Sequence, residues 1–244
     1  MGSLRALARL LRLGLHGLHC VAVCAVVFPF IDAAARMRRV GWACAKALRC
    51  LGVEWQANSV ARPGPLLRIA NHVSWLDILA LNAVQPARFV SKADVQAWPV
   101  LGWIIACGGT LFIERERKRD AMRVLHQVAQ ALRDGDVIAV FPEGTTGNGR
   151  TLLPFHANLL QAAIATGTPV QPVALRYADA TGAPSDAALW LGETTLMQSL
   201  WRIAAAQRLA VSVRLLPPMA PSGHDRRTLA HQAQAAIERA LAAD

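Results

Sequence analysis

The stretch LLRIANHVSWLD, residues 66–77, changes character halfway along its length. Its first five residues are apolar except for Arg68, which is typical of a buried strand, and polar residues follow at once. Asn71 and His72 therefore stand where the strand ends, and ligands of open α/β sheets bind at the carboxyl ends of strands. A helix is expected to begin at Ser74. The stretch thus predicts a strand, a turn that carries a histidine, and a helix.

Asp77 lies five residues after His72, and two interpretations of this spacing are open. In the first, Ser74 and Asp77 form a capping box, and the carboxylate only satisfies the N-terminus of the helix. In the second, His72 lies in the turn before the helix and folds over toward Asp77, because helical positions i and i+5 are about 140° apart. Asp77 then fixes the tautomer of a general base. No GxSxG elbow accompanies the pair, so the attacking hydroxyl is expected to come from the substrate.

From Gly52 to the C-terminus, short apolar runs alternate with segments of helical periodicity. Strands are expected at residues 53–57, 66–70, 87–92, 110–114, 136–141, 169–175 and 209–216. Helices are expected at residues 74–84, 94–107 in broken form, 118–133, 157–166, 193–206 and 225–242. Such alternation predicts an α/β fold in which a mixed sheet is flanked by helices.

The N-terminal part of the chain is far more apolar than the rest. Leu13 to Ile31 contains no charged side chain and is about long enough to cross a bilayer. Pro29 is expected to end this first helix, and residues 31–51 to form a second, amphipathic helix. We expect the pair to lie in or dip into the cytoplasmic leaflet. A true span and a helical cap on a soluble core are the alternatives.

This organisation divides the chain into two parts. Residues 1–51 are expected to be membrane-associating helices, and residues 52–244 to form the α/β domain. The predicted location is the cytoplasmic face of the cytoplasmic membrane. Arginines flank both ends of the apolar segment, so the distribution of positive charge indicates no orientation.

The amino-acid composition indicates which kinds of partner the protein is expected to bind. The formal net charge of +10 suits an anionic partner, and the apolar N-terminal region favours a membrane surface. The arginines are scattered and the chain has one tyrosine, so no nucleic-acid binding is expected. The five cysteines form no CxxC motif and are predicted to be reduced thiols packed as small apolar groups. No metal site is expected, since the remaining histidines occur in isolation.

A second polar turn, FPEGTTGNGRT at residues 141–151, follows the fifth expected strand. Read from Gly144 it approaches a phosphate-binding P-loop, but Arg150 replaces the lysine and a proline interrupts the helix that should follow. Nucleotide hydrolysis is therefore disfavoured. Either this is a surface turn, or Glu143, Gly144 and Thr145 meet a substrate hydroxyl or anion through a carboxylate, backbone N–H groups and a hydroxyl.

Together these motifs resemble those of the glycerolipid acyltransferase family, whose bacterial representative acylates 1-acylglycerol-3-phosphate. NHVSWLD at 71–77 is similar to the family's first motif, an Asn-His followed by four residues and Asp. GTLFIER at 109–115, FPEGTT at 141–146 and VQPVAL at 170–175 are similar to the second, third and fourth motifs. All four occur in the family's order. The resemblance implies helices around a mixed sheet, with an N-terminal two-helix membrane element.

The resemblance also implies a direct mechanism. His72, held by Asp77, deprotonates the free hydroxyl of a lysolipid acceptor. This hydroxyl attacks the thioester of acyl-CoA or acyl carrier protein without an acyl-enzyme, so a co-substrate but no further cofactor is expected. Glu143 and Arg115 hold the acceptor headgroup, and Gly144 lets the backbone approach it.

Two positions leave alternatives open. Lys92 ends the expected strand 87–92, and it either stabilises the oxyanion of the thioester carbonyl or is an ordinary surface lysine. The family's third motif usually ends in an arginine that grips the acceptor phosphate, and Thr146 stands there in this chain. Either Arg150 or Arg115 compensates, or the acceptor carries no phosphomonoester. The acceptors implied are 1-acylglycerol-3-phosphate and lyso-ornithine lipid, and an inactive lipid-binding protein is the remaining alternative.

Overall fold

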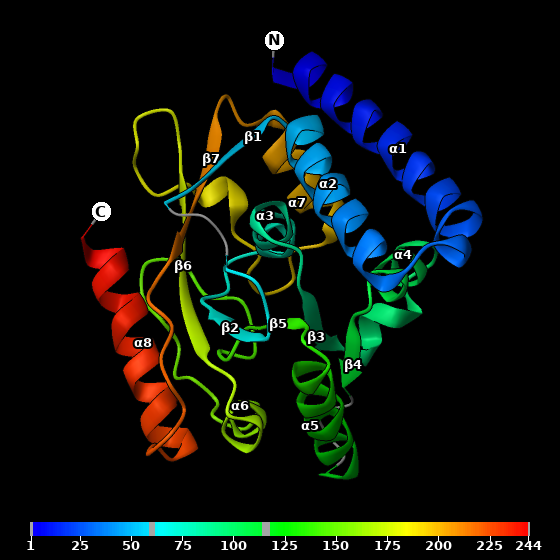
Figure 1. Ribbon diagram of the computed structural model, residues 1–244. Helices are drawn as coiled ribbons and strands as arrows, with labels where there is room; N and C mark the ends of the chain where they lie inside the picture. Colours follow the sequence, from blue (N-terminus) through cyan, green and yellow to red (C-terminus); the bar gives the residue numbers. More distant parts are fainter. Residues whose placement is uncertain (1, 59–61, 114–117, 244) are drawn as a thin grey trace.

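A mixed β-sheet forms the centre of the protein (Figure 1). The computed structural model describes residues 2–58, 62–113 and 118–243. Within them, the strands are β1 (Val53–Ala57), β2 (Leu66–Ala70), β3 (Arg88–Lys92), β4 (Leu111–Ile113), β5 (Val137–Val140), β6 (Val170–Ala178) and β7 (Leu209–Leu215). Their order in the sheet is β1-β7-β6-β2-β5-β3-β4. Strands β6, β2, β5, β3 and β4 run parallel, whereas β7 is antiparallel to β6 and β1 is parallel to β7.

Helices cover both faces of this sheet. They are α1 (Gly2–Val26), α2 (Ala33–Leu51), α3 (Leu76–Val84), α4 (Leu101–Cys107), α5 (Lys118–Arg133), α6 (Leu160–Thr166), α7 (Leu196–Ala205) and α8 (Arg226–Ala242). Apolar side chains of α2, α3 and α7 form a core on one face, and those of α5, α6 and α8 form a core on the other. The long helix α1 lies outermost, across α2 and α7 (Figure 1). The predicted mixed sheet flanked by helices is therefore confirmed.

The expected strands and helices are all present in the described chain, and their ends differ by a few residues. Helix α7 begins later than predicted because Thr195 and Gln198 form a reciprocal capping box at its N-terminus. The expected broken helix at 94–107 consists of a 3₁₀ turn, Ala93–Ala97, followed by α4.

The predicted pair of N-terminal helices is also present. Helix α1 ends at Val26, and Pro29 lies in the short 3₁₀ turn Phe28–Phe30 that follows it. The side chain of Asp32 then caps α2 by accepting a hydrogen bond of 2.6 Å from the backbone N–H of Ala35. Pro29 thus ends the first helix and Asp32 starts the second, so the two do not form one continuous helix.

Helix α1 is fastened to the C-terminal end of α7. Nη1 of Arg9 donates to the carbonyl oxygens of Ala204, at 3.0 Å, and Ala206, at 2.7 Å. Arg5 donates to the carbonyl oxygen of Ala205 between them. These carbonyls belong to the last turn of a helix, where no N–H of the helix reaches them and a cation is favoured.

The rest of α1 presents an apolar surface. The segment Gly2–Phe30 is long and apolar enough to cross a membrane by length and composition, with a mean hydropathy of 1.9 in its most apolar window. Only 17% of that window is buried. The exposed side chains on one side of α1 are Leu4, Leu7, Leu11, Leu15 and Leu18. Since the protein leaves this stripe uncovered, it is a candidate surface for lipid.

Candidate active site

The imidazole of His72 lies in the turn between β2 and α3, where the sheet's parallel strands end. Its Nδ1 is 2.8 Å from Oδ2 of Asp77, and the side chains are 19% and 0% exposed, respectively. Because Nδ1 faces a carboxylate, it carries the proton, and Nε2 is left as an acceptor. The predicted geometry, with the ring folded over the first helical turn, is confirmed.

Asp77 orders the whole turn as well as the ring. Its Oδ2 also accepts hydrogen bonds from the backbone N–H groups of Val73, at 2.7 Å, and Ser74, at 2.9 Å. The capping box is only half formed: Asp77 accepts the N–H of Ser74, but the hydroxyl of Ser74 does not bind the N–H of Asp77 in return. The carboxylate also binds His72, so it does more than cap the helix. The hydroxyl oxygen of Ser74 is buried without a hydrogen-bond partner in the part of the chain that the structure describes. One carboxylate therefore holds both the imidazole of His72 and the turn that carries it.

The turn after β5 supports His72 from a second direction. The ring of Phe141 stacks on the imidazole, with centroids 4.0 Å apart and planes inclined by 8°. Oε1 of Glu143 accepts the backbone N–H of His72 at 2.6 Å, and Oε2 accepts that of Leu153 at 2.9 Å. The backbone N–H of Gly147 donates to the carbonyl oxygen of His72 at 2.7 Å. The turn after β5 thus holds both the backbone N–H and the backbone carbonyl of His72.

Glu143 is buried at only 4% exposure. Burial raises the pKa of its carboxyl group, and the hydrogen bonds from Leu153 and His72 oppose this shift. Both carboxylate oxygens are engaged by the protein, which gives Glu143 a positioning role that the sequence did not predict. Its contact with the acceptor headgroup stays a prediction.

The other residues of this turn differ in exposure. Gly144 has a φ of +75°, a conformation that glycine adopts without strain, and Thr145 is exposed. Thr146, at the position where the family usually has arginine, donates from Oγ1 to the carbonyl oxygen of Trp190. Its side chain therefore fixes the turn to a neighbouring loop.

Strand β6 completes the site, and it contains a residue that sequence reasoning missed. The side-chain amide of Asn71 donates to the carbonyl oxygen of Leu175 at 2.9 Å, and its Oδ1 accepts the backbone N–H of Leu175 at 2.7 Å. Two residues further on, the hydroxyl of Tyr177 donates to Oδ1 of Asp77 at 2.7 Å. The alternation of Val173, Leu175 and Tyr177 on one face of the strand was the available signal.

Two predicted substrate contacts are not joined to this cluster by any described interaction. Lys92 is exposed at the end of β3, the strand that pairs with β5, so it lies along the same edge of the sheet as His72. Its oxyanion role stays a prediction. Arg115 lies outside the described residues. Across the described ranges, no group of three or more His, Cys, Asp or Glu side chains could hold a metal ion.

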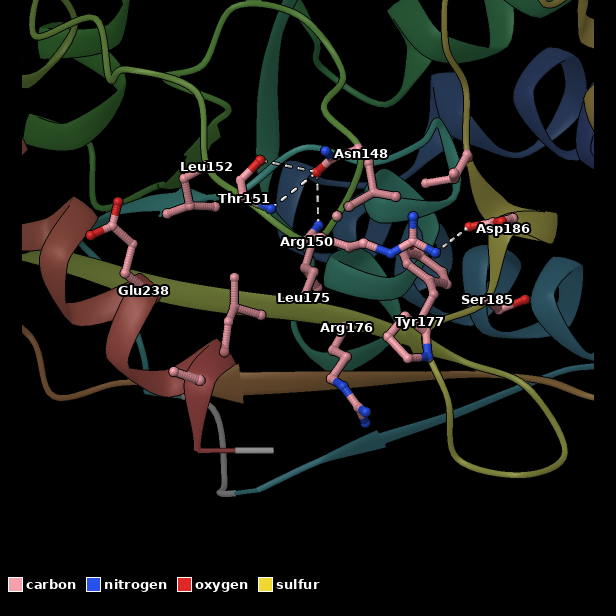
Figure 2. Close-up of a pocket in the computed structure, with 16 residues that line it drawn as sticks. Asn148, Arg150, Thr151, Leu152, Leu175, Arg176, Tyr177, Ser185, Asp186 and Glu238 are labelled. Carbon is pink, nitrogen blue, oxygen red and sulfur yellow. Dashed lines mark hydrogen bonds and ion pairs between the residues drawn. The ribbon is translucent and has the colours of Figure 1, made fainter.

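A cavity of about 510 Å³ lies behind the turn (Figure 2). Val73 and Tyr177 form part of its wall, together with Arg150 from the polar turn at residues 141–151. Nη2 of Arg150 is 3.1 Å from Oδ1 of Asp186, and both side chains are largely exposed. Figure 2 shows the Arg150 guanidinium directed at that carboxylate. An acceptor phosphate that binds Arg150 therefore has to compete with the carboxylate of Asp186 for the guanidinium.

The sequence of this chain is similar to those of known acyltransferases. The profile of the family described as Acyltransferase matches residues 53–176. A lyso-ornithine lipid O-acyltransferase from Pseudomonas aeruginosa is 40% identical over 206 residues, which cover 84% of this chain and 79% of that protein. A 1-acyl-sn-glycerol-3-phosphate acyltransferase from Neisseria gonorrhoeae is 38% identical over 195 residues, covering 80% and 76%.

A solved structure is similar over the whole chain. The crystal structure of the 1-acyl-sn-glycerophosphate acyltransferase from Thermotoga maritima superposes with a TM-score of 0.74 at 18% sequence identity. It covers 100% of this chain and 97% of the other. At this level of identity the likeness establishes the fold alone.

Proposed function

The chain belongs to the Acyltransferase family, and on that premise we propose that it moves a fatty acyl group from a thioester onto the free hydroxyl of a lysolipid. The observation that carries this proposal is the pair of His72 and Asp77. Its Nδ1–Oδ2 distance of 2.8 Å leaves Nε2 as a base, and the imidazole remains partly accessible at 19% exposure.

The chemistry proceeds in one displacement with a tetrahedral intermediate. Nε2 of His72 takes the proton of the acceptor hydroxyl as its oxygen attacks the thioester carbonyl carbon. The C–S bond then breaks, the new ester remains on the acceptor, and the departing thiolate receives the proton from the imidazolium. Asp77 stabilises the imidazolium between these steps. Acyl-CoA or acyl carrier protein supplies the thioester, and Lys92 is the candidate cation for its oxyanion.

Two lysolipids are candidates for the acceptor. 1-Acylglycerol-3-phosphate is the first candidate, as in the Neisseria relative. Lyso-ornithine lipid is the second, and a specific observation favours it: Thr146 replaces the phosphate-gripping arginine and is turned to the Trp190 carbonyl. Arg150, the described alternative, is paired with Asp186. The Pseudomonas relative is a lyso-ornithine lipid O-acyltransferase.

The N-terminal helices are proposed to hold the enzyme on the cytoplasmic face of the membrane, where both substrates meet. The leucine stripe of α1 supplies the apolar contact. Helix α2 exposes Arg38, Arg39, Lys46 and Arg49 on a single side that spans about 100° and also carries exposed Trp42. Arginine, lysine and tryptophan on one helical face suit anionic headgroups at the membrane interface.

The test offers purified protein a labelled acyl thioester with either 1-acylglycerol-3-phosphate or lyso-ornithine lipid, and measures the acylated product and the released thiol. The acceptor that yields product identifies the branch. His72→Ala is expected to lower turnover by about 10²- to 10⁴-fold, because the base is lost. The matched control is His231→Ala, an exposed histidine on α8, on the other side of the sheet. Equal turnover in the two variants would remove His72 as the base, and no acyl transfer from the wild type to either acceptor would overturn the proposal.

A further inference from the structure

Tyr177 is the only tyrosine of the chain, and its hydroxyl group reaches the catalytic carboxylate. The side chain comes from β6, is 4% exposed and packs in the core between the sheet and α3. Its neighbours on the same face of the strand, Val173 and Leu175, are apolar. Phenylalanine would fill this space equally well, so the feature that needs an explanation is the hydroxyl group.

The two oxygens of Asp77 have different partners. Oδ2 accepts from Nδ1 of His72 and from two backbone N–H groups of the turn, whereas Oδ1 accepts from Tyr177 at 2.7 Å. Asp77 is fully buried, so an oxygen without a donor would be costly. Tyr177 therefore holds the end of the carboxylate that faces away from the imidazole.

The backbone of β6 is fixed next to the contact between Tyr177 and Asp77. Asn71, next to His72, makes two hydrogen bonds to the main chain of Leu175, two residues before Tyr177. The same turn thus fixes the histidine and the strand that carries the tyrosine. Burial, followed by the charge of Asp77, raises the pKa of Tyr177, so the phenol stays protonated and remains a donor at physiological pH.

We propose that Tyr177 is a positioning residue of the acyl-transfer reaction, which orients Asp77 and limits how strongly its carboxylate attracts the proton of His72. The proposal rests on the proposed role of His72 as the base. A donor on Oδ1 draws negative charge away from Oδ2, and this lowers the stabilisation of the imidazolium. Tyr177 and His72 thereby share the negative charge of one carboxylate, each from its own oxygen. Glu143, which also faces this pair from the turn after β5, adds to the local field.

The first experiment compares Tyr177→Phe with the wild type over a range of pH. We expect kcat to fall about tenfold, while KM for the acceptor stays the same. The acid limb of the kcat/KM profile, which follows the neutral fraction of His72, is expected to move to higher pH. Ser199→Ala is the matched control, because it removes a buried hydroxyl that binds Trp75 of the same turn but not Asp77. Its acid limb should stay in place.

The single tyrosine allows a second experiment without a mutation. Protein produced with 3-fluorotyrosine carries a more acidic phenol at position 177 alone, and its ring is nearly the same size. The stronger donor is expected to move the acid limb to lower pH, opposite to Tyr177→Phe. This measurement stands even where Tyr177→Phe lowers the folded fraction.

The outcomes separate the two proposals. An acid limb that stays in place in both altered proteins overturns the positioning role, even where activity falls, since lost packing lowers the rate at every pH. A double-mutant cycle adds a check: with Asp77→Asn already present, Tyr177→Phe should cost little more. Full additivity of the two losses contradicts action through Asp77. Absence of acyl transfer in the wild type instead refutes the proposed function.

Discussion

Three side chains from two turns of the chain hold His72. Asp77 binds its Nδ1, Phe141 covers one ring face, and Glu143 binds its backbone N–H. Together these contacts leave the ring little freedom to rotate, which is what a general base requires for a fixed approach of the acceptor hydroxyl. The geometry of His72 therefore depends on contacts that the protein makes with itself.

Glu143→Gln tests this dependence at the level of one atom. Glutamine has a single side-chain acceptor oxygen, so the N–H of either His72 or Leu153 loses its partner in a buried site. The free energy of unfolding is expected to fall by about 1–3 kcal/mol, and acyl transfer to fall with it. Chemical denaturation and initial rates measure both. Glu193→Gln, at an exposed position, is the control, and equal stability of the two variants would contradict the positioning role of Glu143.

Sequence reasoning found His72, Asp77 and Glu143, but it did not predict that Phe141 and Tyr177 contact the pair of His72 and Asp77. His72 and Asp77 are five residues apart, so local geometry allowed their contact as one of two interpretations, and the family resemblance favoured it. Phe141 and Tyr177 reach the pair only through the order of β2, β5 and β6 in the sheet. Strand order follows from tertiary packing, which periodicity along the chain does not encode.

At the scale of elements, the strands and helices were predictable because each carries its own periodicity or its own breaker. Pro29 and Asp32 separate α1 from α2 by local chemistry that can be seen in the sequence. The docking of α1 on α7 was not predicted. It depends on Arg9 meeting carbonyl groups about 195 positions away, at the end of a helix whose direction only the fold defines.

Arg9→Met is expected to weaken that docking. The change keeps the apolar length of the side chain but leaves the carbonyls of Ala204 and Ala206 without their cation. A loss of about 1–2 kcal/mol in the free energy of unfolding is expected, together with faster proteolysis within α1. Arg12→Met, an exposed arginine of the same helix, is the control. If both variants are cut at the same rate, the contact with α7 does not hold α1.

At the scale of the whole molecule, the apolar stripe of α1 and the basic side of α2 lie on two helices that pack together on one flank (Figure 1). Helices α5, α6 and α8 lie on the other side of the sheet. One flank therefore has the surface chemistry of a membrane contact. The sequence predicted the apolar segment itself, whereas the side of the fold that it occupies follows from the packing of α1 and α2.

Replacing two leucines of the stripe tests this contact. Leu7→Asn with Leu11→Asn is expected to lower binding to vesicles of anionic phospholipid by at least tenfold in sedimentation, because each leucine contributes about 1.5–3 kcal/mol when buried in lipid. Met122→Asn, an exposed apolar residue on α5, is the control. Vesicle binding that survives the double substitution would refute the role of α1. Thioester cleavage with a water-soluble acceptor should persist, since these leucines lie outside the catalytic cluster.

The two hydrogen bonds between Asn71 and the main chain of Leu175 can form only late in synthesis of the protein. They join positions 104 residues apart, and the bond from Tyr177 to Asp77 joins positions 100 residues apart. Until β6 has left the ribosome and entered the sheet, Asn71 and Oδ1 of Asp77 lack these partners. The full order around His72 therefore arises only with the completed sheet, and an unfinished chain lacks the contacts that hold the histidine in the folded protein.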